Sequence, residues 1–398
     1  MNKSILKLAK IAEKKDRLII GLMSGTSLDG LDIALCRITG SGTASTLSLM
    51  HFKTMPYDDL FRQQIRKIFA KRQIDHQMLC GLNAYVAEVH SQLIRETLKD
   101  WNIDPSQIDV IASHGQTVYH APQSLTGDPS LPNSTLQIGD GDHFAVRTGI
   151  ITLSDFRQKH LAAGGEGAPL AAYGDYLLFS SEEEHRILLN IGGISNFTFL
   201  PRIGTNLKAY ATDLGPGNTM MNQYMFAHYG EEMDKDAAVA ASGRVSEELL
   251  KRLKSHPFLN IEFPKTTGPE LFNLDYLNAC LESVSISEQI YEADVMATLN
   301  SFSAQTIVEG IKRAIAGLDH TKIYVSGGGL HNPMLMNQLV DEFPGAVTSF
   351  QELGLDPDAK EACLFAVLAN ETLCGDPKNV NHIKDSPAVC MGKISLPY

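Results

Sequence analysis

The chain has 398 residues, a formal net charge of −12 and a hydrophobic content of 43%. This length exceeds what one hydrophobic core commonly supports, so we expect two lobes. The acidic charge argues against nucleic acid or an anionic membrane as a partner. No apolar run reaches the length of a membrane span, and the six cysteines are scattered without metal-ligand spacing. We therefore expect a cytoplasmic protein with reduced thiols.

The most informative segment, residues 18–36, contains two apolar strand-like runs around a turn rich in Gly, Ser, Thr and Asp. Gly25 and Gly30 allow the backbone to turn tightly and to approach an anion closely. We interpret the turn as a phosphate-binding hairpin. Hydroxyl groups of the same turn are further expected donors: Ser24, Thr26 and Ser27.

Two carboxylates, Asp29 and Asp32, lie beside this turn. They would repel a phosphate unless a divalent cation, or a proton in transit, lay between them. The hairpin therefore favours Mg–nucleotide chemistry, with Asp29 and Asp32 organising Mg²⁺, water or the loop itself. An ordinary polar hairpin is the alternative that the local sequence leaves open.

Beyond the hairpin, apolar patterning predicts alternating helices and strands in both halves of the chain, which indicates α/β lobes with mixed sheets. The predicted helices cover about 57–70, 76–100, 164–179, 245–255, 294–318 and 359–373. The predicted strands cover 110–118, 148–153, 186–200 (two strands about a glycine turn) and 322–326.

The segment 186–200 repeats the strand, glycine turn and strand that open the first half. Such a repeat is typical of a duplicated lobe. We predict an N-terminal lobe over 1–170 and a C-terminal lobe over 171–398, with the last helix allowed to pack back on the first lobe.

Glycine-rich turns recur along the chain, although neither a Walker A sequence nor a strand-linked Gly-x-Gly-x-x-Gly is present. A single turn of this kind is more often plain turn geometry. Five of them at strand or helix ends favour a polyphosphate clamped between two lobes. Besides the first hairpin, they are the turns at 162–169, 190–193, 213–218 and 326–329.

Asp213 is the carboxylate that we predict to be catalytic. It follows a short apolar stretch and precedes Gly-Pro-Gly-Asn, so its side chain should project from a strand end beside a phosphate-contacting loop. A general base is required at such a place. Capping of the following turn is an equally good local interpretation.

Further polar residues could recognise a substrate. His114, with Gln116 and Thr117, ends a predicted buried strand, although a core histidine is the more common reading of His114 alone. Arg157 and Lys159 could meet a carboxylate or a phosphate, and solvation at the surface is the alternative for both. Glu361 in the last helix could be a ligand or an exposed helix residue.

In their order along the chain, these motifs closely resemble the anhydro-N-acetylmuramic acid kinases. The resemblance implies the two-lobed, actin-like ATPase fold with duplicated ribonuclease H-like lobes, and nucleotide and sugar in the cleft between them. It also implies ATP with Mg²⁺ and a small sugar substrate. The motifs are 21–32, 113–117, 155–157, 162–170, 190–196, 213–218, 265–268 and 326–329.

The implied reaction converts 1,6-anhydro-N-acetylmuramic acid, ATP and water to N-acetylmuramic acid 6-phosphate and ADP in cell-wall recycling. The base, Asp213, would deprotonate a water that attacks the anomeric carbon, and the released O6 would take the γ-phosphoryl group. The implied sugar site contains Gln116, Thr117, Lys159 and Glu361. The implied ATP site contains Gly25, Thr26, Ser27, Leu28, Asp29, Gly30, Leu31, Asp32, Gly192, Gly193, Gly215, Gly217, Asn218, Gly327, Gly328 and Gly329.

The chain departs from the family pattern at His160 and Asn222, where Asp is common, and at Pro269, where Arg is frequent. These departures concern the sugar contacts and a metal-ordering role of position 222.

The alternatives to this function are a kinase of the same fold for another sugar and a non-catalytic sugar- or ATP-responsive switch. A homodimer is a further expectation.

Overall fold

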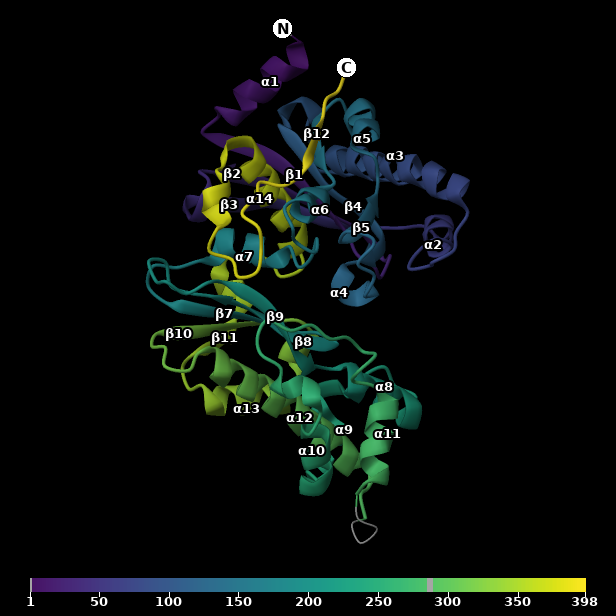
Figure 1. Ribbon diagram of the computed structural model, residues 1–398, viewed down its shortest axis with the longest axis vertical. Helices are drawn as coiled ribbons and strands as arrows, with labels where there is room; N and C mark the ends of the chain where they lie inside the picture. Colours follow the sequence, from purple (N-terminus) through teal and green to yellow (C-terminus); the bar gives the residue numbers. More distant parts are fainter. Residues whose placement is uncertain (1, 285–288) are drawn as a thin grey trace. The chain divides into compact units, whose positions relative to one another are not determined.

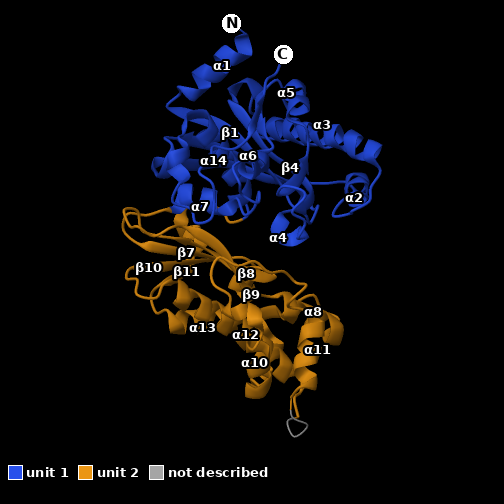
Figure 2. Cartoon of the chain, viewed as in Figure 1, with its two compact units in different colours: residues 1–179, 358–398 blue, residues 180–357 orange. Residues whose placement is uncertain are grey.

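The computed structural model describes residues 2–284 and 289–398, which belong to two compact units (Figures 1 and 2). Unit 1 consists of residues 1–179 and 358–398, and unit 2 consists of residues 180–357. The units divide at 179/180, whereas the predicted division lay at 170/171, and residues 358–398 with the last helix belong to unit 1.

The described residues of unit 1 form a seven-stranded sheet. Its strands are β1 (Asp16–Ser24), β2 (Gly30–Thr39), β3 (Thr46–Pro56), β4 (Val110–Ala121), β5 (Ser134–Ile138), β6 (Ile151–Ser154) and β12 (Lys393–Ser395). The order is β12-β6-β4-β1-β2-β3, and β5 pairs with β4. β1, β2 and β3 form an antiparallel meander, whereas β4 is parallel to β1 and β6 is parallel to β4.

The described residues of unit 2 form a five-stranded sheet. Its strands are β7 (His185–Ile191), β8 (Ile194–Leu200), β9 (Tyr210–Pro216), β10 (Thr321–Ser326) and β11 (Val347–Ser349). β7, β8 and β9 are antiparallel, β10 is parallel to β7, and β11 is parallel to β10. The order β3-β2-β1-β4-β6 in unit 1 corresponds to β9-β8-β7-β10-β11 in unit 2, and both read 3-2-1-4-5 when β5, which pairs with β4 beside this path, is left out of the numbering. This shared topology confirms the predicted duplication of an α/β lobe with mixed strands.

Helices cover the sheets of both units (Figure 1). Those of unit 1 are α1 (Lys3–Ala12), α2 (Asp59–Arg66), α3 (His76–Asp100), α4 (Gln123–Thr126), α5 (Gly141–Thr148), α6 (Phe156–Ala162), α7 (Ala171–Phe179) and α14 (Lys360–Cys374). Those of unit 2 are α8 (Thr219–Tyr229), α9 (Ala238–Ser242), α10 (Glu247–Lys254), α11 (Leu274–Glu282), α12 (Glu292–Ala314) and α13 (Pro333–Glu342). Within the described ranges, none of these helices combines the length and apolar character needed to cross a membrane.

The position of α14 explains why the end of the chain belongs to unit 1. This helix contacts β1, β2, β4 and α7, and its residues 362–371 are all buried. The contact with β1 is close, because a Cβ at Gly21 would lie 1.9 Å from the carbonyl oxygen of Ala362. An ion pair of 2.8 Å between Lys360 and the buried Asp175 ties α14 to α7. The predicted boundary at 170/171 separates α7 from the rest of unit 1, whereas the packing of the last helix on the first lobe was allowed for in the prediction.

Helix boundaries follow local capping chemistry. α3 begins where the Asp75 side chain accepts a hydrogen bond from the Met78 N–H, and its bounds equal the predicted 76–100. The predicted helix over 164–179 begins only at Ala171, because the glycines near Gly164 and the imide of Pro169 disfavour an earlier helical start.

Candidate functional site

The turn between β1 and β2 in unit 1 is ordered by its own side chains. The Ser27 hydroxyl donates to Asp29 Oδ1 at 2.7 Å, and the Gly30 N–H donates to the same oxygen at 3.1 Å. The Ser27 hydrogen bond lowers the pKa of Asp29. Leu28 has a left-handed φ of 59° and a buried side chain that anchors the turn in the core. Asp29 Oδ1 therefore joins two groups of the turn, the Ser27 hydroxyl and the Gly30 N–H.

Asp32 lies on β2, next to this turn. Its Oδ1 accepts a 2.5 Å hydrogen bond from the Thr54 hydroxyl of β3. Burial raises the pKa of Asp32, and the neighbouring Asp29 carboxylate adds to the rise. Among the described residues, no group of three or more His, Cys, Asp or Glu side chains could hold a metal ion. Any metal at this turn would have to take most of its ligands from water or substrate.

The structure corrects the expected role of Ser24. Its side chain is 2% exposed, and its hydroxyl donates to Gln116 Oε1 at 2.5 Å. A hydroxyl committed in this way is not a phosphate donor. The hairpin residues still predicted to bind phosphate therefore begin after Ser24.

The four predicted sugar-site residues all belong to unit 1. Gln116 and Thr117 are neighbours on β4, and Gln116 donates to the carbonyl oxygen of Gly25 at 3.3 Å. Glu361 is an exposed residue in the first turn of α14, and surrounding protein atoms that reduce its hydration raise its pKa. Lys159 lies on α6 and is exposed. The structure thus links Gln116 to the glycine turn, and among the described residues no hydrogen bond or ion pair joins Lys159 to the other three.

Arg157 and His114 form a pair inside unit 1. The Arg157 Nε–H donates to His114 Nε2 at 3.0 Å, and a guanidinium N–H donates to the carbonyl oxygen of Gly167 at 2.6 Å. Burial lowers the pKa of Arg157 to about 10 and that of His114 to about 3. His114 is therefore a neutral acceptor that orients Arg157, as expected of a core histidine.

His160 supports the glycine-rich loop 162–169, a role that the sequence did not indicate. Its Nδ1 accepts a 2.9 Å hydrogen bond from the Gly167 N–H, and burial lowers the pKa of His160 to about 4. A Cβ at Gly165 would lie 2.2 Å from the imidazole ring. The departure from the family pattern at position 160 thus places an imidazole acceptor under the loop.

Asp213 of unit 2 lies inside β9 and not at a strand end, because β9 continues to Pro216. The ladder with β8 is nevertheless irregular at this point. Asn196 pairs with Asp213 and Ser195 pairs with Gly215, so Leu214 is an extra residue. Such a bulge bends a strand and turns its side chains in new directions.

The segment from Lys265 to Thr267 holds Asp213. The Asp213 N–H donates to the Lys265 carbonyl oxygen at 2.9 Å, and the Thr267 N–H donates to Asp213 Oδ2 at 2.8 Å. Burial raises the pKa of Asp213, while the Thr267 hydrogen bond opposes the rise. The motif 265–268 therefore supports the predicted base through its backbone.

Lys265 fixes this supporting segment to the core of unit 2. Its ammonium group donates to the carbonyl oxygens of Phe258 at 2.8 Å and Leu259 at 3.1 Å. The ammonium nitrogen also lies 4.3 Å from the centre of the Phe258 ring, within cation–π range. Burial lowers the pKa of Lys265 to about 8.

Three of the predicted glycine turns meet at the end of β7 in unit 2. The N–H groups of Gly217 and Asn218 donate to the carbonyl oxygens of Gly193 (2.8 Å) and Gly192 (2.9 Å). A Cβ at Gly217 would lie 2.4 Å from the Gly192 carbonyl oxygen. Gly327 has a φ of 86°, and a Cβ there would lie 2.6 Å from Asn190 Oδ1. The turns can approach one another this closely only because the residues at the contacts are glycines, which have no Cβ.

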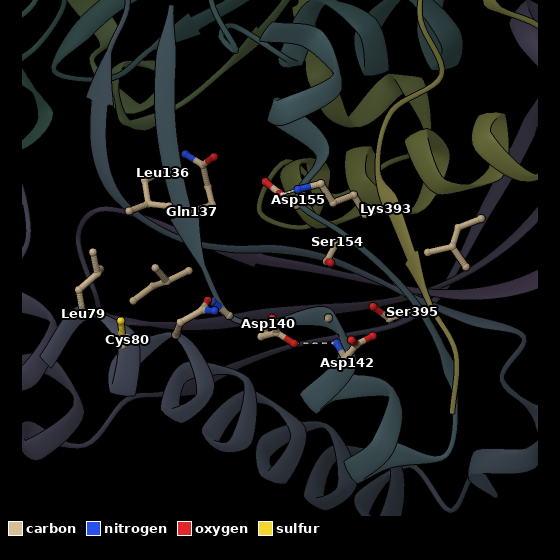
Figure 3. A pocket seen from close by; sticks show the side chains of 15 residues that line it. Leu79, Cys80, Leu136, Gln137, Asp140, Asp142, Ser154, Asp155, Lys393 and Ser395 are labelled. Carbon is tan, nitrogen blue, oxygen red and sulfur yellow. Dashed lines mark hydrogen bonds and ion pairs between the residues drawn. The ribbon is translucent and has the colours of Figure 1, made fainter. Parts of the chain in front are cut away.

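A cavity of about 540 Å³ in unit 1 (Figure 3) adjoins two predicted sugar-site residues, because Gln137, which lines it, donates to the Thr117 hydroxyl at 3.2 Å and Ile138 pairs with Gln116. Asp155 and Lys393 form an ion pair of 2.5 Å at its edge, and Asp140 caps α5 by accepting from the Asp142 N–H. None of the residues that line it was predicted to bind ATP or sugar.

The sequence of this chain is similar to a known protein family. The family profile described as anhydro-N-acetylmuramic acid kinase matches residues 17–395. The anhydro-N-acetylmuramic acid kinases of Pseudoalteromonas atlantica and Pseudoalteromonas translucida are 52% and 48% identical over 401 residues, with both chains fully covered. That of Caldanaerobacter subterraneus is 36% identical over 98% of this chain and all of its own.

A solved structure of the activator of the 2-hydroxyisocaproyl-CoA dehydratase from Clostridium difficile, with bound ADPNP, aligns with 89% of this chain and 95% of its own at 11% identity. Its TM-score of 0.38 is too low to carry an argument about fold or function. The family match and the full-length relatives do not depend on it. The chain belongs to the anhydro-N-acetylmuramic acid kinase family.

Proposed function

We propose that this protein is an ATP-dependent kinase that opens the ring of 1,6-anhydro-N-acetylmuramic acid and phosphorylates O6, giving N-acetylmuramic acid 6-phosphate and ADP. The family match over residues 17–395 carries the proposal. The reaction belongs to cell-wall recycling and takes place in the cytoplasm, where ATP is available.

Asp213 is the proposed general base. Ionised, it takes a proton from water, the oxygen of that water bonds to the anomeric carbon, and the bond from that carbon to the bridging oxygen breaks. The released O6 then attacks the γ-phosphorus of ATP and ADP leaves. The hydrogen bond from the Thr267 N–H to Asp213 Oδ2 supports this role. It fixes one oxygen of the carboxylate, and the direction of the other oxygen is thereby fixed as well.

The turn from Gly25 to Asp32 and the glycine turns of unit 2 are the proposed ATP-binding segments. Glycine-rich turns of this kind let the backbone approach phosphate oxygens closely. Mg²⁺ would neutralise charge on the transferred phosphoryl group. Asp29 and Asp32 are its candidate protein ligands, and a site with only one or two carboxylates fits Mg²⁺ bound mainly through phosphates and water. The proposed sugar contacts are Gln116, Thr117, Lys159 and Glu361.

The test is turnover in ¹⁸O-labelled water. With Mg-ATP and the anhydro sugar, we expect ADP release and one ¹⁸O atom at the anomeric position, measured by mass spectrometry before the hemiacetal exchanges with solvent. Unlabelled product would contradict the hydrolytic step. A kinase for another sugar would release ADP only with that sugar, and a non-catalytic switch would release none.

A further inference from the structure

Arg157 of α6 is a partly buried cation that lacks a neutralising carboxylate. Among residues 2–284 and 289–398, no Asp or Glu oxygen lies within 4.0 Å of its guanidinium. Burial lowers the pKa of Arg157 to about 10, and the Glu361 carboxylate opposes this effect only from a greater distance. Because burial of a charge without an ion-pair partner costs free energy, the position of Arg157 requires an explanation.

Two of the three guanidinium nitrogens of Arg157 have acceptors in the protein. Nε donates to His114 Nε2 at 3.0 Å, and Nη1 donates to the carbonyl oxygen of Gly167 at 2.6 Å. In the part of the chain that the structure describes, no group accepts a hydrogen bond from the third nitrogen, Nη2. Nη2 is also not closed off from solvent. Both of its N–H bonds are therefore available to a ligand.

Arg17 is an arginine of the same unit with a purely structural role. It is 2% exposed, and all three of its guanidinium nitrogens have acceptors. Nε donates to Asn370 Oδ1 at 2.7 Å, Nη1 to the Lys14 carbonyl oxygen at 2.6 Å and Nη2 to the Gly40 carbonyl oxygen at 3.3 Å. Neutral oxygens thus satisfy this buried arginine completely. Arg157 differs because the nitrogen that a ligand could reach has no such acceptor.

The two acceptors of Arg157 fix its guanidinium in place before a ligand binds. The His114 ring packs against Phe365 of α14, with ring centroids 4.8 Å apart. The Gly167 N–H donates to His160 Nδ1 at 2.9 Å, which holds the residue whose carbonyl oxygen Arg157 contacts. A planar fork that is held at two nitrogens loses little conformational entropy when it binds a ligand through the third.

The position of Arg157 in unit 1 favours the sugar as its ligand. Its partner His114 lies on β4, the strand that also contains Gln116 and Thr117. Glu361 is the carboxylate whose charge acts on Arg157. Gln116, Thr117 and Glu361 are proposed sugar contacts, so the unused nitrogen belongs to the same region of unit 1.

A carboxylate suits this position better than a polyphosphate does. A guanidinium binds either group through charge-assisted hydrogen bonds. Reduced hydration raises the pKa of Glu361, and the charge of Asp32 adds to the rise. These two carboxylates would repel the several charges of a polyphosphate, whereas one carboxylate balances the single charge of Arg157. N-acetylmuramic acid carries one carboxylate, on the lactyl ether that N-acetylglucosamine lacks.

We propose that Arg157 binds the lactyl carboxylate of the anhydro sugar through Nη2 and makes the enzyme selective for muramic acid. The inference rests on the proposed function, in which the anhydro sugar is the substrate, and adds to it a residue that recognises the acid group. Arg157 determines specificity and transfers neither a proton nor the phosphoryl group. The bound sugar supplies the anion that the guanidinium lacks in unit 1.

The test compares two ligands of the same size: the anhydro sugar and its lactyl carboxamide, in which –CONH₂ replaces –COO⁻. For the wild-type protein, the Kd of the carboxylate form, measured by calorimetry without ATP, should be about 10- to 100-fold lower than that of the carboxamide. In Arg157→Gln this ratio should fall below about threefold, because the charge that distinguishes the two ligands is gone. A general loss of stability does not imitate this result, because it affects both ligands alike.

Arg17→Gln is the matched control. It should lower the free energy of unfolding and leave the ratio of the two Kd values as in the wild-type protein. Arg157→Lys keeps the charge without the fork, so its ratio should lie between those of the wild-type protein and Arg157→Gln, and it serves if Arg157→Gln does not fold. An unchanged ratio in Arg157→Gln, or a wild-type ratio below about twofold, would overturn the proposal.

Calorimetry with Mg-ADPNP tests the other source of an anion. If Arg157→Gln binds Mg-ADPNP more weakly and keeps the wild-type ratio for the sugars, Arg157 binds phosphate and the proposal is wrong. If the wild-type protein binds neither form of the sugar, the proposed function fails and the inference falls with it. If it binds both forms equally well, the substrate class stands and only the role of Arg157 is excluded.

Discussion

The Thr267 N–H donates a hydrogen bond of 2.8 Å to one oxygen of the Asp213 carboxylate. Burial raises the pKa of Asp213. The two effects oppose each other. The N–H favours the ionised form that a base requires, while burial makes that form a stronger proton acceptor. Because only the ionised form is active, kcat should fall as the pH is lowered through this raised pKa.

We predict that Asp213→Asn lowers kcat by about 10²- to 10⁴-fold, the usual contribution of general base catalysis. The amide oxygen of Asn can still accept from the Thr267 N–H, so the fold and the affinity for ADPNP should change little. Steady-state kinetics and calorimetry with ADPNP measure the two effects separately.

Asp234→Asn is the matched control in the same unit. The Asp234 oxygens accept from the N–H groups of Val239 and Ala240, each at 2.9 Å, so this carboxylate has a structural role. Its loss should lower the free energy of unfolding and leave kcat unchanged. Normal turnover by Asp213→Asn would remove Asp213 from the role of base.

At the scale of elements, the close contact between β1 and α14 makes a glycine obligatory at position 21. A Cβ there would lie 1.9 Å from a backbone oxygen of α14, which cannot move without shifting the helix. We predict that Gly21→Ala lowers the free energy of unfolding by about 3 kcal/mol or more, measured by urea denaturation.

Gly81→Ala provides the opposite control. Gly81 lies inside α3 and has no atom within 4 Å of a Cβ placed there. The same substitution should raise the free energy of unfolding by up to about 1 kcal/mol, because alanine favours helices. Equal effects at the two positions would show that the β1–α14 contact is looser than described.

Sequence patterns predicted individual elements better than the contacts between them. Apolar patterning predicted α3 over its full length, because this signal is local. The bulge at Leu214 depends on the register with β8, which local sequence does not encode. The contact of Tyr57 with His90 joins residues 33 positions apart, and only the packing of α3 on the sheet brings them together.

The candidate site was predictable to the extent that it consists of local motifs. Glycine turns and the resemblance to a kinase family identified Asp213 and the first hairpin. The support of Asp213 by Thr267 comes from 54 residues away, and the commitment of Ser24 to Gln116 spans 92 positions. Such partners are defined by tertiary structure, so Ser24 was assigned a phosphate contact that its burial forbids.

At the scale of the molecule, unit 2 is one continuous segment and unit 1 is formed from two. We predict that residues 180–357 fold when produced alone, because they contain a complete sheet with its own cores. Residues 1–179 alone should not fold stably, because they lack the helix that covers β1, β2 and β4. Circular dichroism and urea denaturation of the two fragments test this.

A third fragment serves as the control. Residues 1–179 joined by a flexible linker to 358–398 should recover a cooperative unfolding transition, since this restores every described element of unit 1. Cooperative unfolding of 1–179 alone would contradict the role given to α14.

The late position of α14 in the chain also affects synthesis on the ribosome. Domains commonly fold in the order of their emergence, but here unit 2 is complete before unit 1. About 195 residues separate the end of α7 from the end of α14, which at ordinary translation rates is a delay of about 10 to 40 s. During that interval the apolar face of β1 and β2 is not yet covered by α14. A nascent chain of this protein is therefore a natural client for chaperones that shield such surfaces until translation ends.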